Sequence, residues 1–227
     1  MIPVAAPSRV AARLRTTGDG PVPLVHRGPD AVYVDVGGWC VGVVGTHATA
    51  VPCALRTAVR VLPEVARASV RGGVLHLDEE PLVVGRLVDV RVPGLHRKID
   101  PRPTISGAVL NGDEVADLVG RGDGLTPYGD DVLCGWLAVH RAAGVATRAV
   151  DETVRALAPT TTLLSATLLD CAMHGEAIPE FAAWLTALGT AAEESRAQAL
   201  ARVGHTSGRG LLEGARRALD ELERVAA

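Results

Sequence analysis

The first hundred residues carry hydrophobic and polar positions that alternate with a period of two, the pattern of half-buried β-strands. The clearest case is a pair of apolar runs at 31–36 and 39–44, joined by Gly37-Gly38. Two glycines in a two-residue connection favour a β-hairpin, because both central residues of such a turn need positive φ. Further strands are expected to begin at 50–53 and to cover 74–77 and 82–92, and a short helix is expected over 8–16.

From about residue 112 the hydrophobic spacing changes to the 3.6-residue period of amphipathic helices. Before this change, residues 99–107 contain two prolines, which indicate a linker or an extended crossing strand. Strands followed by helices predict an α+β fold, with a β-rich N-terminal domain over 1–105 and a helical domain over 106–227. Helices are expected over 112–120, 127–143, 147–157, 161–175, 179–188, 190–203 and 207–226.

Composition narrows the classes of function. A net charge of −3, no basic tract and 3% aromatic residues argue against nucleic-acid binding. We expect no membrane span, because no apolar run is long enough, and no signal peptide, because the early arginines follow the apolar residues. A cytoplasmic location is therefore expected. The four cysteines form no Cys-x-x-Cys pair and the histidines lack metal-ligand spacing, so no zinc site is predicted.

One glycine-rich stretch, residues 120–131, is the strongest candidate for a site. Its glycines allow close backbone approach, and Thr126-Pro127 is typical of a helix start, with Thr as the cap. A glycine-rich loop that leads into a helix N-terminus is suited to anions. Asp130 and Asp131 lie in the first turn, where they could hold a metal ion, take a proton or interact with the helix dipole.

Residues 203–214 repeat this arrangement. Gly204 is expected to end one helix and Thr206 or Ser207 to cap the next, whose first turn contains Gly208 and Gly210. Glycine costs about 1 kcal/mol relative to alanine inside a helix, so two of them indicate that something requires close backbone approach. His205 lies at the mouth of this turn.

A third stretch, 165–175, places small residues on one helix face and includes Ser165. The face is expected either to pack closely against a neighbouring helix or to present Ser165 to a ligand beside the two loops.

These three stretches together resemble the signature blocks of the AllH-like family, which is associated with oxamate carbamoyltransferase. The matching residues are Gly-x-Gly-Leu-Thr-Pro-x-Gly-Asp-Asp at 122–131, Ser-Ala-Thr-Leu-Leu at 165–169 and Gly-His-Thr-Ser-Gly at 204–208. Tyr128, Thr206 and Arg209 depart from the residues that we expect in the family, and these departures bear on the substrate.

The resemblance implies carbamoyl transfer from carbamoyl phosphate to a small amide acid such as oxamate, together with partner subunits or a homo-oligomer. Under this hypothesis, backbone N–H groups and hydroxyls of the two loops bind the small anionic substrate. His205 would shuttle a proton, with Asp130 and Asp131 as the other catalytic candidates. The substrate-binding candidates are Gly122, Gly124, Thr126, Gly129, Ser165, Thr206, Ser207 and Gly208.

Two alternatives stay open from the sequence. The chain could be a non-catalytic subunit that binds a small anion and completes a partner's active site. It could also be a phosphate or nucleotide enzyme that uses Mg²⁺ at Asp130 and Asp131, since Mg²⁺ favours carboxylates together with substrate phosphate. No other cofactor is expected. Because neighbouring residues on a helix point about 100° apart, the two aspartates are not expected to serve one centre equally.

Overall fold

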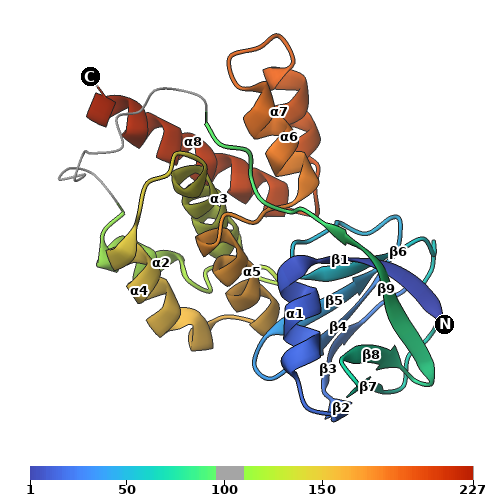
Figure 1. Cartoon of the computed structure of the whole chain (residues 1–227). Helices are drawn as coiled ribbons and strands as arrows, with labels where there is room; N and C mark the ends of the chain where they lie inside the picture. Colours follow the sequence, from blue (N-terminus) through green and yellow to red (C-terminus); the bar gives the residue numbers. More distant parts are fainter. Residues whose placement is uncertain (96–109, 227) are drawn as a thin grey trace. The chain divides into compact units, whose positions relative to one another are not determined.

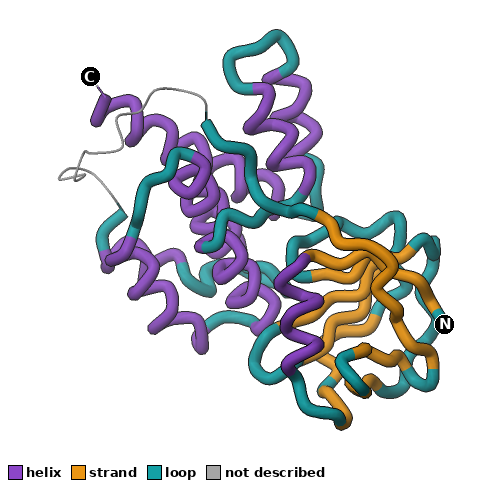
Figure 2. The backbone as a smooth tube through the Cα atoms, in the orientation of Figure 1, coloured by secondary structure: helices purple, strands orange, loops and turns teal. Residues whose placement is uncertain are grey.

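The computed structural model describes residues 1–95 and 110–226 and divides them into two compact units, Met1–Val90 and Arg91–Ala227. Strands lie in the first unit and all but one of the helices lie in the second, so the fold is α+β as predicted (Figures 1 and 2). The expected linker at 99–107 and the expected boundary at 105/106 lie outside the described residues.

The first unit is a nine-stranded sheet with one helix, α1 (Ser8–Thr16). The strand order is β2-β7-β8-β9-β1-β6-β5-β4-β3; β1 pairs with β9 and β5 with β6 in parallel, and the other pairs are antiparallel. The strands are β1 (Ile2–Pro7), β2 (Gly20–Val22), β3 (Leu24–Arg27), β4 (Ala31–Asp35), β5 (Cys40–Val44), β6 (Ala54–Thr57), β7 (Ala68–Arg71), β8 (Val74–Leu77) and β9 (Glu80–Val88).

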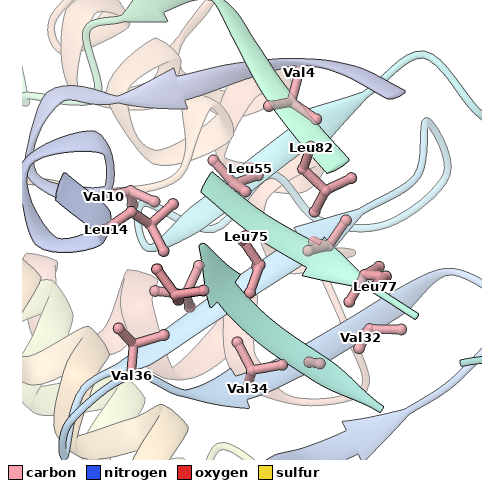
Figure 3. Close-up of a cluster of buried hydrophobic side chains, with 14 of the residues drawn as sticks. Val4, Val10, Leu14, Val32, Val34, Val36, Leu55, Leu75, Leu77 and Leu82 are labelled. Carbon is pink, nitrogen blue, oxygen red and sulfur yellow. The ribbon is translucent and has the colours of Figure 1, made fainter. Parts of the chain in front are cut away.

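The predicted hairpin is confirmed as β4 and β5. Asp35 pairs with Cys40, and Gly37 and Gly38 have φ of 61° and 78°, the two positive values that the turn demands. Period-two alternation sends every second side chain inward, and the core contains residues from both halves of the strand order and from α1 (Figure 3). Leu55, Leu75 and Val34 thus share one core with Leu14 of α1, so the sheet curves around it.

Some elements of this unit differ from the prediction. Strands β1, β2, β3 and β7 were not predicted, because they are short or rich in proline, glycine and polar residues. The strand expected from 50–53 begins at Ala54, since Cys53 belongs to the preceding turn, where the N–H of Ala54 donates to the carbonyl of Val51. The helix over 8–16 is confirmed.

The second unit contains seven α-helices and one 3₁₀ turn among its described residues. Their order agrees with the prediction, and their ends differ by a few residues. They are α2 (Gly112–Leu118), α3 (Tyr128–Ala142), α4 (Arg148–Leu157), η1 (Ala158–Thr160), α5 (Leu163–Met173), α6 (Pro179–Ala187), α7 (Glu193–Ala201) and α8 (Ser207–Ala226).

Helix α3 is the centre of this unit, and nearly all of its residues are buried. It packs along α8 and also contacts α5 and α2 (Figure 1). Glycines set the distance between α3 and α8: a Cβ on Gly135 would lie 2.0 Å from the carbonyl oxygen of Leu211, and one on Gly214 would lie 1.8 Å from that of Val132. Such distances are far below van der Waals contact, so only glycine allows this packing.

Candidate functional site

The two glycine-rich stretches meet in the folded unit. Thr126 Oγ1 and Ser207 Oγ lie 2.9 Å apart and form a hydrogen bond in which either hydroxyl can donate. Thr126 does not cap α3 as predicted. Pro127 holds the cap position, and its carbonyl accepts the N–H groups of Asp130 and Asp131. The Thr126 hydroxyl is therefore directed to α8, and it joins the start of one helix to the start of the other.

Asp131 lies next to the hydrogen-bonded pair of Thr126 and Ser207, which we call the junction. Its side chain comes from the first turn of α3, is 4% exposed and interacts with Ser207. Its Oδ2 atom is buried and accepts no hydrogen bond from any described residue. Burial, with a smaller contribution from the charge of Asp130, raises the pKa of Asp131 to about 7, and the interaction with Ser207 acts in the opposite direction. A buried carboxyl with a free oxygen and a shifted pKa is typical of functional sites.

Asp130 faces a different part of the unit. One carboxylate oxygen accepts the backbone N–H of Gly120 at 2.8 Å, and the other accepts the hydroxyl of Thr161 at 2.5 Å. Asp130 is fully buried, and these bonds connect the end of α2, the start of α3 and the segment before α5. The expectation that neighbouring aspartates diverge is met. Asp130 positions the loop, and Asp131 is the residue at the junction.

The two carboxylates do not fit the Mg²⁺ ion considered from the sequence. Both oxygens of Asp130 already accept hydrogen bonds, and Asp131 is turned toward α8. Within 1–95 and 110–226, no three His, Cys, Asp or Glu side chains come together in a way that could hold a metal ion.

His205 lies on the exposed side of the second stretch. Its backbone carbonyl accepts a hydrogen bond of 2.9 Å from the Arg209 guanidinium. No contact between its imidazole and Asp131 or Asp130 is present among the described residues. The structure thus brings Thr126, Ser207 and Asp131 together, while His205 stays at the rim.

The glycines of the two stretches serve packing as well as turns. A Cβ on Gly129 would lie 2.0 Å from the Leu118 carbonyl oxygen, and one on Gly208 would lie 1.8 Å from that of Leu200. Gly122 has φ of 120°, and a Cβ there would lie 2.7 Å from the backbone nitrogen of Tyr128. Gly124, with φ of 88°, is exposed and has open space around it. The close approach inferred from the sequence is real, and at Gly129 and Gly208 it is made by the chain itself.

Several helix-start N–H groups that were expected to bind anions donate within the chain. Gly129 donates to Arg121 at 2.9 Å, Gly208 to Val203 at 3.0 Å and Gly210 to Thr206 at 3.0 Å, each to a carbonyl oxygen. Thr206 thus stands at the cap position of α8, as one of the two residues predicted there. The hydroxyl and carboxyl groups are consequently the main chemistry of this junction.

The third stretch reaches the first loop through a residue that was not predicted. Ser165 is 1% exposed within α5, and the contact is made by Thr162, whose hydroxyl donates to the Leu125 carbonyl at 2.6 Å. Thr162 also caps α5 by accepting the N–H of Ser165 at 3.0 Å. The sequence could have indicated Thr162, because a threonine at the start of a predicted helix is a typical N-cap residue.

Two of the residues that depart from the family pattern, Tyr128 and Arg209, interact with each other. Tyr128 donates a hydrogen bond of 2.5 Å to Glu213 of α8, and it also interacts with Arg209 and Asp131. Desolvation, followed by the Glu213 bond, raises the pKa of Tyr128 to about 12, so the phenol stays protonated and can donate. Tyr128 therefore borders the junction through its interaction with Asp131.

A family model described as oxamate carbamoyltransferase subunit AllH matches residues 118–219. The matched span contains both glycine-rich stretches, Asp131 and most of α8, so it includes every residue of the junction. This span of the chain is similar to the AllH family, and the resemblance seen in the sequence is confirmed over residues 118–219. No curated protein and no solved structure matches the chain. Among the described residues, no helix is both long and apolar enough to cross a membrane.

Proposed function

We propose that the chain is a subunit of a carbamoyltransferase that transfers a carbamoyl group between carbamoyl phosphate and a small amide acid such as oxamate, with oxalurate as the product. The family match supports the association with oxamate carbamoyltransferase. The observation that carries the choice of site is the Thr126–Ser207 hydrogen bond, which joins the two glycine-rich stretches over Asp131.

The substrate is placed at the surface of this junction. Thr126, Thr206 and Ser207 are partly exposed and supply hydroxyl groups, while Gly122 and Gly124 supply a loop whose backbone is accessible. Gly129, Gly208 and Ser165 are buried and hold the surrounding helices, and Asp130 fixes the loop from behind. A small planar acid with an amide at one end matches a surface made of hydroxyls with a carboxyl beneath it.

Partner subunits complete the enzyme in this proposal. The matched family is described as a subunit, and a junction formed by three side chains offers few groups for a phosphate dianion. We place the phosphate of carbamoyl phosphate largely on a partner, and the amide acid on Thr126, Ser207 and the loop at 122–124.

The test is a binding and turnover experiment with the full chain, alone and together with its partner subunits. Thermal unfolding is followed with oxamate, carbamoyl phosphate, phosphate and ATP, each with and without Mg²⁺; a ligand at 100 times its Kd adds about 2.7 kcal/mol of stability. We expect oxamate to stabilise the wild type, with the effect lost in Thr126→Val and kept in the remote control Thr186→Val. We expect turnover only with the partners present.

Three results would redirect the proposal. Stabilisation by ATP with Mg²⁺ alone would indicate a nucleotide enzyme. Oxamate binding that persists in Thr126→Val would place the ligand elsewhere. Binding without any carbamoyl transfer in the complete assembly would make the chain a non-catalytic anion-binding subunit.

A further inference from the structure

One carboxyl oxygen of the helical unit is buried without a hydrogen-bond donor at the place where two helices begin. Asp131 is 4% exposed, and its Oδ2 atom is buried and accepts no hydrogen bond from any described residue. A buried acceptor that lacks a donor lowers stability, and native proteins keep few of them. This oxygen therefore calls for an explanation, and a bound ligand that donates to it is one.

Packing distances show where the Asp131 side chain lies. It belongs to the first turn of α3, and a Cβ on Gly210, in the first turn of α8, would lie 2.8 Å from the Asp131 Cβ. Gly210 follows Ser207 by almost one helical turn, and the Ser207 hydroxyl lies 2.9 Å from that of Thr126. The Asp131 side chain is therefore held between the starts of the two helices that the Thr126–Ser207 bond joins.

The adjacent carboxyl, Asp130, has no oxygen without a donor. Its two oxygens accept the N–H of Gly120 at 2.8 Å and the hydroxyl of Thr161 at 2.5 Å. A ligand at the junction therefore meets two kinds of group: two hydroxyls, which can donate, and the Asp131 Oδ2 atom, which only accepts when the carboxyl is ionised. A small molecule with a carboxylate at one end and an N–H group at the other matches both.

We infer that Asp131 Oδ2 accepts an N–H from the amide of the bound substrate, and that this bond selects an amide acid over a dicarboxylate. This inference rests on the proposed function and deepens it, because it names the residue that distinguishes oxamate from oxalate. Since Oδ2 is buried in the free chain, the substrate reaches it by separating the Thr126 and Ser207 hydroxyls, which then donate to the substrate carboxylate. Asp131 thus contacts the substrate as a specificity residue.

The selection follows from what each ligand presents to Oδ2. Oxamate and oxalate are similar in size, and they differ because oxamate has an amide where oxalate has a second carboxylate. An ionised Asp131 gains a charge-assisted hydrogen bond from the amide, whereas the oxalate carboxylate has no hydrogen to donate and carries the same sign of charge. A site built to hydrogen-bond a substrate N–H strongly rejects the analogue that lacks it, because a buried polar group is then left without a partner.

The protonation state of Asp131 should set the strength of this selection. Burial is the main cause that raises the pKa of Asp131 to about 7, and the charge of Asp130 adds to it. The charged groups of α8 on this side are Arg209 and Glu213, which interact with Tyr128 and have opposite signs. Below pH 7 the protonated carboxyl can donate to an oxalate oxygen, so the preference for oxamate should weaken as pH falls.

The experiment measures the Kd of oxamate and of oxalate by calorimetry from pH 6 to pH 8.5, with the full chain alone and assembled with its partner subunits. Wild type should bind oxamate about tenfold or more tightly than oxalate at pH 8, the size of one hydrogen bond to a charged group. Asp131→Asn should bring the two Kd values within about threefold at every pH, because an amide both donates and accepts. Exposed Asp117→Asn is the matched control and should keep the wild-type ratio and its pH dependence.

The outcomes separate this inference from the proposed function. If the wild-type assembly binds oxamate and transfers the carbamoyl group while Asp131→Asn keeps the wild-type ratio, Asp131 does not select the amide and the proposed function stands. Oxalate binding as tight as oxamate binding in wild type at pH 8 would have the same meaning. No oxamate binding by the chain or the assembly would overturn the proposed function and the selection with it. Thermal unfolding checks that each variant is folded, and Asp131→Ser, which also lacks the carboxyl, takes the place of Asp131→Asn if that variant does not fold.

Discussion

Thr126 and Ser207 stand 81 positions apart in the sequence, and their hydroxyl oxygens lie 2.9 Å apart in the fold. This bond joins the start of α3 to the start of α8. We predict that the two residues are energetically coupled. In a double-mutant cycle with Thr126→Val and Ser207→Ala, the coupling in the free energy of unfolding should be about 0.5–1.5 kcal/mol, the net value of one hydrogen bond. Denaturant unfolding measures it.

The control cycle replaces Thr126→Val by Thr186→Val, an exposed α6 threonine whose hydroxyl donates to Ala182 within its own helix. The effects of Thr186→Val and Ser207→Ala on the free energy of unfolding should be additive. Additive effects in the Thr126–Ser207 cycle as well would mean that the hydrogen bond between the two loops does not stabilise the fold.

Asp131→Asn should stabilise the protein at neutral and alkaline pH. The folded state holds the pKa of Asp131 at about 7 against a reference value of 3.8, so between these values the folded state binds more protons than the unfolded state. The free energy of unfolding therefore falls as pH rises through this window, and the loss is complete above pH 7. We expect the amide variant to gain about 2–4 kcal/mol at pH 8 and little at pH 4. Urea unfolding at several pH values gives the difference, with exposed Asp117→Asn as the matched control.

Asp130→Asn should destabilise the protein, in contrast to Asp131→Asn. Its carboxylate accepts bonds from the N–H of Gly120 and the hydroxyl of Thr161 in a buried position, and an amide offers only one acceptor oxygen. Loss of stability of about 1–3 kcal/mol is expected. Thr161→Val should account for part of this loss, and a cycle between the two should show coupling. Equal effects at positions 130 and 131 would contradict the separate roles assigned to the two aspartates.

Gly135→Ala and Gly214→Ala should destabilise the helical unit severely. Each added Cβ would lie 2.0 Å or less from a backbone oxygen of the partner helix, which cannot move away without separating α3 from α8. We expect a loss of more than about 3 kcal/mol, or no folding, whereas the same change usually favours a helix by about 1 kcal/mol. Gly112→Ala in α2, whose Cβ would meet nothing closer than 3.8 Å, is the matched control. Circular dichroism melts compare the three variants.

His140 should make stability depend on pH in the acid range. It is fully buried in α3, where Nδ1 lies 2.9 Å from the Trp136 carbonyl oxygen and Nε2 lies 4.0 Å from Glu221 Oε2. Burial lowers the pKa of His140 to about 4 from a reference value of 6.5, so the unfolded state binds the extra proton between these values. Stability contributed by the neutral form is present above pH 6.5 and falls with pH by about 3 kcal/mol toward pH 4.

His140→Gln should remove this slope relative to wild type, and exposed His205→Gln is the matched control. Urea unfolding from pH 4 to 7 measures both. An unchanged slope in His140→Gln would assign the acid sensitivity to other groups. Burial also raises the pKa of the neighbouring Glu221, which accepts the indole N–H of Trp136, and its contribution falls as pH rises; the comparison of variants separates the two.

Much of the fold could be read from local patterns. A period of two with Gly37-Gly38 predicted the hairpin, because both glycines supply the positive φ of its turn. A period of 3.6 predicted seven helices, because each helix has to bury one face. The strands β2 and β7 are only three and four residues long, too short for a period to be recognised in the sequence, and they form because pairing with a neighbouring strand satisfies their backbone.

The sequence by itself determined the resemblance to the AllH-like family, the α+β class and the two stretches in which the site was sought. Only the tertiary structure decided which residues of those stretches meet, because helix crossing depends on contacts between distant residues. Gly135 and Gly214 bring α3 and α8 together, and that approach directs Asp131 to Ser207 and Asp130 to Thr161. Two adjacent, chemically identical side chains acquire different roles because Asp131 lies by the Thr126–Ser207 pair, whereas Asp130 accepts hydrogen bonds from the Gly120 N–H and the Thr161 hydroxyl.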